Sequence, residues 1–336
     1  MTNVERFHKL MAGDASLDAS PVIEWAIWWD KTLQGWHEEG LPDVTGRALF
    51  DYFGLDHIEQ FWFNHYSPEC PKPDIMEHLI EDDKDYTRIR PHILPEDAVQ
   101  QEMDRILKTK PLHACGDTIV WYTVNGFFWF TRELFGDEMN CLSFYECPEL
   151  RHRICEDLLQ WQIKVIDEFS QYIRADFMTI AEDMSYNKGP MISEATFREF
   201  IMPYYKRLIP EIKKYGTKVF VDTDGNVDMM LPWLIEAGVD GVLPLERQAG
   251  VDLPEYRRKY PDFMFIGGFD KMCLFQGEMA IRAEFERLLP VIRSGRYLIG
   301  MDHQTPPGVP METYRYYLKL LHEYSFYACK DCGQRC

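Results

Sequence analysis

The sequence predicts an α/β fold: one (β/α)8 barrel domain over residues 1–336, with helical additions at its N-terminal side. Three observations lead to it. Short runs such as FMTIA (177–181) and YLIG (297–300) are almost wholly apolar, which is typical of parallel strands covered on both faces. Segments with helical spacing alternate with these runs, as in parallel sheets. No Gly/Ser linker divides the chain. A doubly wound open sheet is the second choice, because no GxGxxG turn is present.

The elements of the C-terminal half follow one another regularly. The predicted strands are 177–181, 219–221, 241–245, 263–267 and 297–300. The predicted helices are 193–215, 228–237, 280–292 and 311–324. The first of these helices opens on Ser193, a good N-cap, and contains Pro203, which predicts a kink.

The N-terminal half is less regular. Its predicted strands are 21–26, 86–93 and 118–124, which bring the total to the eight strands of a barrel. Its predicted helices are 29–39, 95–109 and 148–172.

The charge balance excludes some partners. Lys and Arg number 36 against 55 Asp and Glu, a formal charge of −19, which repels phosphate backbones and anionic lipid surfaces. We therefore expect no nucleic-acid or membrane partner. The N-terminus lacks the pattern of a signal peptide, and no apolar run approaches the roughly 18 residues that span a bilayer. A cytoplasmic location is expected.

Nine cysteines are scattered through the chain, which indicates reduced thiols rather than a disulfide framework. Only the end of the chain groups three of them, as CKDCGQRC (329–336). A metal site there would need a fourth ligand. We expect residues 327–336 to form a mobile tail instead.

Ionisable residues follow five of the predicted strands. In a barrel, these positions converge on one mouth. They are Glu182, Asp183, Asp222, Asp224, Glu246, Asp270, Lys271, Asp302 and His303. Clustered acids raise one another's pKa values, so a cation is needed to keep them ionised, and carboxylates with an imidazole are usual zinc ligands. Each acid alone has an alternative interpretation as a turn former or helix cap.

Aromatic residues near the strand ends are candidates for a substrate pocket, either for an aromatic ether or, through cation–π attraction, for a methylammonium group. The alternative is that they belong to the core. The candidates are Trp25, Trp28, Trp29, Phe127, Trp129 and Tyr186.

Three segments carry a family resemblance. AEDMSYNKGPMISEATFREFIMPYYKRL (181–208), GGFDK (267–271) and HQTPPGVPMET (303–313) resemble the uroporphyrinogen decarboxylase superfamily, which includes zinc-dependent cobalamin methyltransferases. The resemblance is best over residues 176–324 and implies a (β/α) barrel. True decarboxylases resemble one another in an arginine-bearing N-terminal segment, whereas residues 20–42 here contain no arginine. This difference argues against a polyanionic porphyrinogen as substrate.

The comparison also implies a changed metal site. Asp222-Thr223-Asp224-Gly225 stands where the similar methyltransferases have His-x-Cys-Gly, and His303 stands where they have a last-strand Cys. Carboxylate and imidazole ligands would leave a harder, more Lewis-acidic ion, suited to an oxygen or amine of a methyl donor.

The expected function is therefore a zinc-dependent methyltransferase that moves a methyl group from a small methoxylated or methylated compound to the corrinoid (cobalamin) of a partner protein. Its zinc ligands would come from Glu182, Asp222, Asp224 and His303. Glu246 or Asp270 would fix the substrate or deliver a proton, and Lys271 would hold the carboxylates. Two alternatives stay open: a metal-free decarboxylase or lyase acting on a small acid, and an inert barrel that binds a corrinoid or small ligand. A homodimer is one open choice of oligomeric state.

Overall fold

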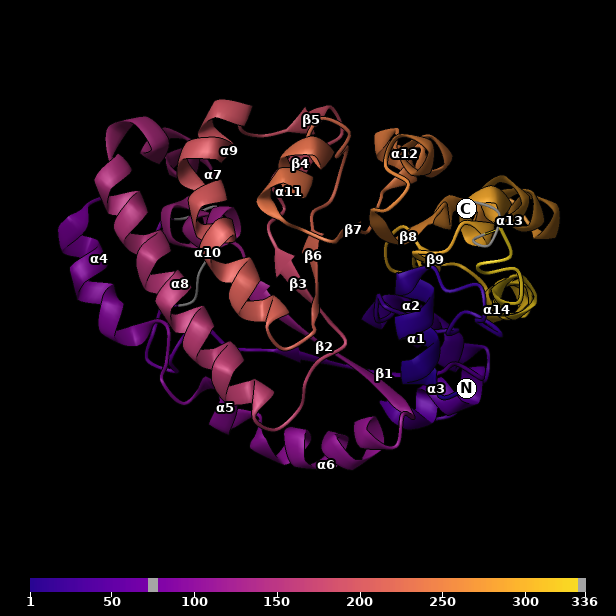
Figure 1. Cartoon of the computed structure of the whole chain (residues 1–336). Coiled ribbons are helices and arrows are strands. Elements are labelled where there is room, and N and C mark those ends of the chain that lie inside the picture. Colours follow the sequence, from indigo (N-terminus) through magenta and orange to yellow (C-terminus); the bar gives the residue numbers. More distant parts are fainter. Residues whose placement is uncertain (72–77, 332–336) are drawn as a thin grey trace.

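The structure, a computed structural model, describes residues 1–71 and 78–331. Its main feature is a curled parallel sheet with strand order β1-β2-β3-β6-β7-β8-β9 (Figure 1). The strands are β1 (His57–Trp62), β2 (Thr118–Asn125), β3 (Phe177–Ala181), β6 (Lys218–Asp222), β7 (Gly241–Leu243), β8 (Met264–Phe269) and β9 (Tyr297–Met301). The barrel-like fold is confirmed. Within the described ranges, the sheet has seven strands rather than eight and does not close between β1 and β9.

Helices cover the outer face of the sheet, and a small hairpin of β4 (Ser185–Tyr186) and β5 (Gly189–Pro190) follows β3 (Figure 1). The helices are α1 (Asn3–Ala12), α2 (Asp30–Glu38), α3 (Arg47–Phe53), α4 (Asp83–Ile89), α5 (Ala98–Gln101), α6 (Met103–Ala114), α7 (Phe127–Glu146), α8 (Pro148–Ser170), α9 (Glu194–Phe200), α10 (Met202–Lys213), α11 (Leu231–Ala237), α12 (Leu253–Lys259), α13 (Glu278–Arg293) and α14 (Met311–Ser325).

Helix α1 closes the end of the sheet at which the strands begin. Phe7 stacks on Phe177 with ring centroids 5.1 Å apart, and Phe177 in turn stacks on Trp121. Because this end is filled with aromatic side chains, a cavity among the strands can open only toward their carboxyl ends or through the gap between β1 and β9.

Two predicted strands are wrong, and one strand of the main sheet was missed. Residues 21–26 form no strand. Residues 86–93 fall in α4 and a short 3-10 turn; the Asp82 carboxylate accepts from the backbone N–H groups of Lys84 and Asp85 and so caps this helix. Strand β1 escaped prediction because its sequence, HIEQFW, is polar and its side chains are mostly half-buried.

Other expectations are confirmed or refined. The helix predicted over 193–215 is two helices, broken at Ile201 just before Pro203. Residues 327–331 of the segment predicted as a mobile tail, 327–336, are described, and there Cys329 is buried and its N–H donates to Ile292 O of α13. Cys332 and Cys336 lie outside the described residues. Among the helices that are described, none is long and apolar enough to cross a membrane.

Candidate functional site

A cavity of about 250 Å³ opens at the carboxyl ends of the strands; we call it the mouth cavity. Tryptophans form one part of its wall and carboxylates another. It is lined by Trp25, Ala26, Gln60, Trp62, Trp121, Trp129, Ala181, Asp183, Asp222, Asp224, His303 and Gln304. The strand-end reasoning thus placed Asp222, Asp224 and His303 together correctly.

The turn after β6 aims two acids at the cavity. Asp222 and Asp224 line it, whereas Thr223 between them is buried and accepts a hydrogen bond from Met184 N. Residues two apart in an extended chain share a face, which is why both acids point the same way. Gly225 follows with φ +84°, and a Cβ there would lie 2.6 Å from the Tyr186 backbone. Only glycine therefore permits this turn.

Asp183 is a third acid in the same cavity, and the sequence analysis left it out of the ligand set. It has φ +39°, and its Oδ1 accepts from Asp224 N at 3.2 Å. Burial, with the neighbouring carboxylates, raises the pKa of Asp224 to about 7. Burial and the charges of Asp183 and Asp224 raise the pKa of Asp222 well above its usual range. The three acids therefore repel one another when ionised, and the charge of Lys271 offsets this repulsion only in part at Asp224.

His303 faces these acids from the end of β9. Its Nε2 lies 3.9 Å from Asp224 Oδ2. Burial lowers the pKa of His303, and nearby Lys271 lowers it further. The imidazole is thus mainly neutral at pH 7, which is the form that binds a metal ion.

Glu182 does not share this cavity. Its carboxylate is fully buried and accepts from the N–H groups of Phe127, Phe128 and Trp129, at 2.8–3.2 Å, and from the Tyr205 hydroxyl. The first three donors belong to the opening turn of α7, where backbone N–H groups lack helical partners. Both oxygens are thereby occupied. The structure gives Glu182 a role in anchoring α7 rather than the predicted role of metal ligand.

The predicted catalytic residues form a layer behind the mouth cavity. Lys271 Nζ lies 3.4 Å from Glu246 Oε1 and 3.5 Å from Asp302 Oδ1. Glu246 Oε2 accepts from Gly225 N, so this network supports the turn that carries Asp224. Asp270 caps the 3-10 turn after β8 and accepts from Met272 N. These groups position the acids; they do not line the cavity.

The aromatic candidates divide into three groups. Trp25 and Trp129 line the mouth cavity. Trp28 and Phe127 are buried in the core instead, where Trp28 packs against Phe50 and Phe127 stacks on Tyr204. Trp29 is exposed, with its ring 6.4 Å from that of His303, and Tyr186 is exposed on the β4–β5 hairpin.

Four polar or aromatic lining residues were not predicted. Gln60 and Trp62 lie on β1, whose strand pattern was missed, and Trp121 and Gln304 lie in a predicted strand and loop without any local signal of function. The register between β1 and β2, which places Gln60 beside Trp121, is visible only in three dimensions.

The side chains of the cavity are of the types that bind a divalent cation, although they are not yet arranged around a single position. Asp183, Asp222 and Asp224 offer oxygens and His303 offers a nitrogen, which is a donor set that zinc accepts. Among the described residues, the pKa of the Asp222 carboxyl is raised by burial and by the charges of Asp183 and Asp224, with no hydrogen bond to offset them. Over the same residues, no group of three or more His, Cys, Asp or Glu side chains is already close enough to hold a metal.

Comparison with known proteins agrees with the barrel fold. The sequence profile of the uroporphyrinogen decarboxylase (URO-D) family matches residues 139–324. A methyltransferase from Methanosarcina mazei superposes with a TM-score of 0.70 at 15% identity, over 98% of this chain and 100% of that one. At this identity the likeness concerns the fold.

Curated relatives match about half of the chain. The uroporphyrinogen decarboxylase of Anaeromyxobacter sp. (strain Fw109-5) is 26% identical over 187 residues, and that of Bordetella petrii is 25% identical over 191 residues. Each match covers 54% of this chain and 50% of the relative, so the chain spans about half the length of these curated relatives. The family profile covers more than half of the chain and, with the fold, decides the assignment: the chain belongs to the uroporphyrinogen decarboxylase family.

Proposed function

We propose that this protein is a metal-dependent methyltransferase that takes a methyl group from a small methoxylated or methylated compound and passes it to the cobalt of a partner's corrinoid. The observation that carries the proposal is the mouth cavity itself, in which three mutually repelling carboxylates and a neutral imidazole face a tryptophan wall. Such an acid cluster is satisfied by a cation. The methyltransferase with a similar fold is consistent with this activity.

The proposed metal site is revised from the sequence-based one. Asp222, Asp224 and His303 would hold the ion, with Asp183 in place of Glu182. When bound, a zinc ion would polarise the heteroatom that carries the methyl group, so that this atom leaves more readily.

The protein's own groups would do the rest. Trp25, Trp62 and Trp129 would hold the apolar part of the donor and exclude water. As the carbon–oxygen bond breaks, its electron pair stays on oxygen, and the electron pair of Co(I) forms the new bond to carbon. The leaving oxygen would take up its proton from solvent once the transfer is complete, because carboxylates that hold a metal are deprotonated and cannot supply it. Glu246 and Lys271 would keep the Asp224 turn in place.

A decarboxylase acting on a small acid is the second candidate. Asp222, whose pKa is raised well above its usual range, is a carboxylic acid able to protonate a carbanion. A porphyrinogen with many carboxylates suits the site less, because the described residues lining the mouth cavity include neither arginine nor lysine.

The test is a parallel assay of the purified protein. One arm supplies reduced cobalamin with a panel of aryl methyl ethers and methylamines, and the other measures CO₂ release from small acids. Methylcobalamin formation with no CO₂ release supports methyl transfer. CO₂ release without methylation supports the second candidate, and inactivity in both arms would favour a barrel that only binds a ligand.

A further inference from the structure

Strand β1 has a free edge in the part of the chain that the structure describes. β1 pairs with β2 alone, and β9 at the far end of the sheet pairs with β8 alone. Residues 21–29 lie between these edges without forming a strand. This segment contacts β9 through Trp25, whose Nε1 donates a hydrogen bond to Met301 O at 2.9 Å. The gap is thus bridged by side chains, not by a ladder of backbone hydrogen bonds.

A second cavity, of about 500 Å³, fills this gap; we call it the seam cavity. Its walls come from residues 24–27, α3, β1, the start of β2 and α6. Trp25, Gln60 and Trp121 line both this cavity and the mouth cavity, so the two are neighbours that share a wall. The volume lies within the range of small-molecule sites, about 300–1,000 Å³.

The seam cavity is basic in an acidic protein. Arg47, Arg105 and Lys108 line it in a chain whose formal charge is −19. Two carboxyl residues also line it: Glu59 is paired with Arg105 at 2.6 Å, and burial raises the pKa of Glu24 to about 8, which keeps it neutral at pH 7. The positive charges therefore outnumber the negative ones.

Lys108 is the cation best placed to receive a ligand. Arg105 already binds Glu59 and Gln60 O, and Arg47 binds Asp117 at 2.7 Å. Lys108 is exposed on α6, and no ion pair or hydrogen bond occupies its Nζ among the described residues. An ammonium group without a partner at the side of a cavity favours an anion there.

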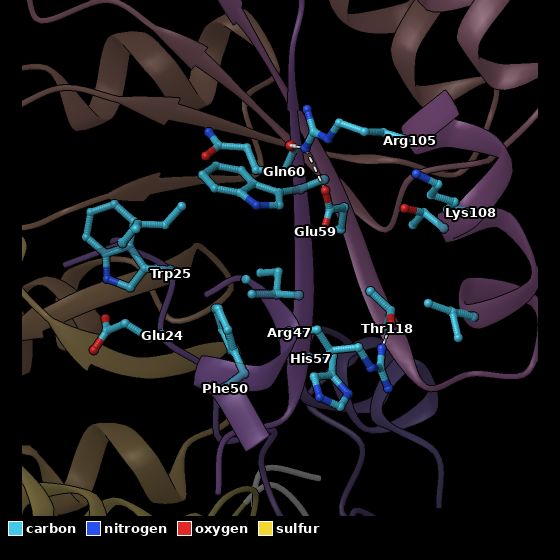
Figure 2. Close-up of a pocket in the computed structure, with 16 residues that line it drawn as sticks. Glu24, Trp25, Arg47, Phe50, His57, Glu59, Gln60, Arg105, Lys108 and Thr118 are labelled. Atoms are coloured by element: carbon cyan, nitrogen blue, oxygen red, sulfur yellow. Dashed lines mark hydrogen bonds and ion pairs between the residues drawn. The ribbon is translucent and has the colours of Figure 1, made fainter. Parts of the chain in front are cut away.

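The rest of the wall is apolar and aromatic. Figure 2 shows Trp25 and Phe50 on one flank of the cavity and Arg105 and Lys108 on the opposite flank, with Glu59 and Gln60 of β1 between them. Ile27, Ile58 and Leu112 also line it. Flat rings suit an aromatic wall, because offset stacking and edge contacts add to simple burial.

We propose that the seam cavity binds a small aromatic carboxylate, with its ring against Trp25 and Phe50 and its carboxylate toward Lys108. The aromatic flank suits the ring of such a molecule, and the basic flank suits its carboxylate. This site goes beyond methyl transfer and does not depend on it, since neither metal nor corrinoid is needed for the binding.

The test is titration calorimetry of the full chain with 2-naphthoate, and with 2-naphthalenemethanol as a neutral analogue of similar shape. We expect 2-naphthoate to bind, the neutral analogue to bind at least tenfold more weakly, and added salt to weaken the naphthoate complex, as for a partly exposed charge pair. Absence of naphthoate binding, or equal affinity for both compounds, would overturn the proposal.

Substitutions at two lysines of α6 test whether 2-naphthoate binds in the seam cavity. Lys108→Gln should weaken naphthoate about tenfold, the size expected for loss of one charged hydrogen bond. Lys110→Gln, at an exposed lysine of the same helix that does not line the cavity, should leave the affinity unchanged. Because Lys108 has no partner to lose, its replacement should not affect folding, which far-UV circular dichroism and the thermal midpoint can verify. Unchanged naphthoate affinity in folded Lys108→Gln, or equal loss in Lys110→Gln, would contradict the assignment.

Discussion

Asp224 Oδ2 and His303 Nε2 lie 3.9 Å apart at the rim of the mouth cavity, where the turn after β6 meets the end of β9. Burial raises the pKa of Asp224 to about 7 and lowers that of His303. At neutral pH Asp224 is therefore only partly ionised and His303 is mainly neutral, so the two do not form a full ion pair. With Asp183 and Asp222 close behind, the arrangement is one that a shared cation would stabilise.

Asp224→Asn should stabilise the metal-free protein at alkaline pH. The folded-state pKa of about 7 exceeds the usual value of 3.8, so the folded chain binds this proton more tightly than the unfolded chain. The stabilisation from the proton is complete below about pH 4 and is lost as the pH rises through about 7. Since the side chain is partly exposed, we expect a gain on the order of 1 kcal/mol at about pH 8, shrinking toward zero near pH 4.

Urea unfolding in the presence of a chelator, at several pH values, measures this gain. Asp228→Asn is the matched control: it lies four residues further along and pairs with Lys259 at 3.4 Å outside the cavity. A gain for Asp224→Asn that does not grow with pH would contradict the repulsion assigned to the acids.

Metal retention should depend on the cavity residues and not on Glu182. Wild-type protein prepared without chelator should carry roughly one zinc per chain, as in a mononuclear site. His303→Ala or Asp222→Asn should lose most of it, because each removes a ligand, whereas Asp228→Asn should keep it. Elemental analysis of the folded variants gives the answer. Full zinc in His303→Ala would remove this residue from the ligand set.

Glu182→Ala should destabilise the fold by about 3–5 kcal/mol, because several buried donors lose their acceptor and each unsatisfied donor costs about 1–3 kcal/mol. The change leaves three backbone N–H groups of α7 and the Tyr205 hydroxyl without an acceptor. Tyr205→Phe, which removes a single donor, should cost only about 1 kcal/mol. Chemical unfolding of both variants compares them, and a Glu182→Ala protein as stable as Tyr205→Phe would rule out the anchoring role.

Gly300→Ala should disturb the shared wall of the two cavities. A Cβ at Gly300 would lie 2.8 Å from Trp25 Cδ1, so the indole must move. We expect a several-fold loss of 2-naphthoate affinity and a higher KM for methyl donors, with zinc content unchanged. Gly35→Ala is the control, since a Cβ there meets no atom within 4 Å. Equal ligand affinity in the two variants would show that Trp25 does not shape the cavities.

The sequence predicted the fold best where strands are buried on both faces. Runs such as FMTIA in β3 are too apolar to lie at the surface, which makes such strands easy to recognise. Six of the eight predicted strands are present in the structure. β1 was missed because an edge strand needs fewer apolar residues, and its Glu59 and Gln60 face the seam cavity. Residues 86–93 alternate like a strand, yet the Asp82 cap makes them a helix, a local bond that outweighs the pattern.

The site was predictable to the extent that strand ends converge. This rule brought Asp222, Asp224 and His303 to one cavity. The strand-end rule could not show that the Glu182 side chain points toward α7. The run GFFWF gives no sign that a 20-residue helix begins at Phe127. A Cβ at Gly126 would lie 2.0 Å from Glu182 Cδ, so glycine at the start of α7 is the one sequence feature that reflects this contact.

Methyl transfer to cobalt is the central claim, and a single-turnover reaction with an isotopically labelled methyl donor tests it most directly. Zinc-loaded wild-type protein, reduced cobalamin and an aryl methyl ether carrying the label should yield labelled methylcobalamin, detected by mass spectrometry, while folded His303→Ala should yield at least 100-fold less, the loss expected when a catalytic metal site is broken. No labelled methylcobalamin from any ether or amine, or equal yields from the two proteins, would contradict the account.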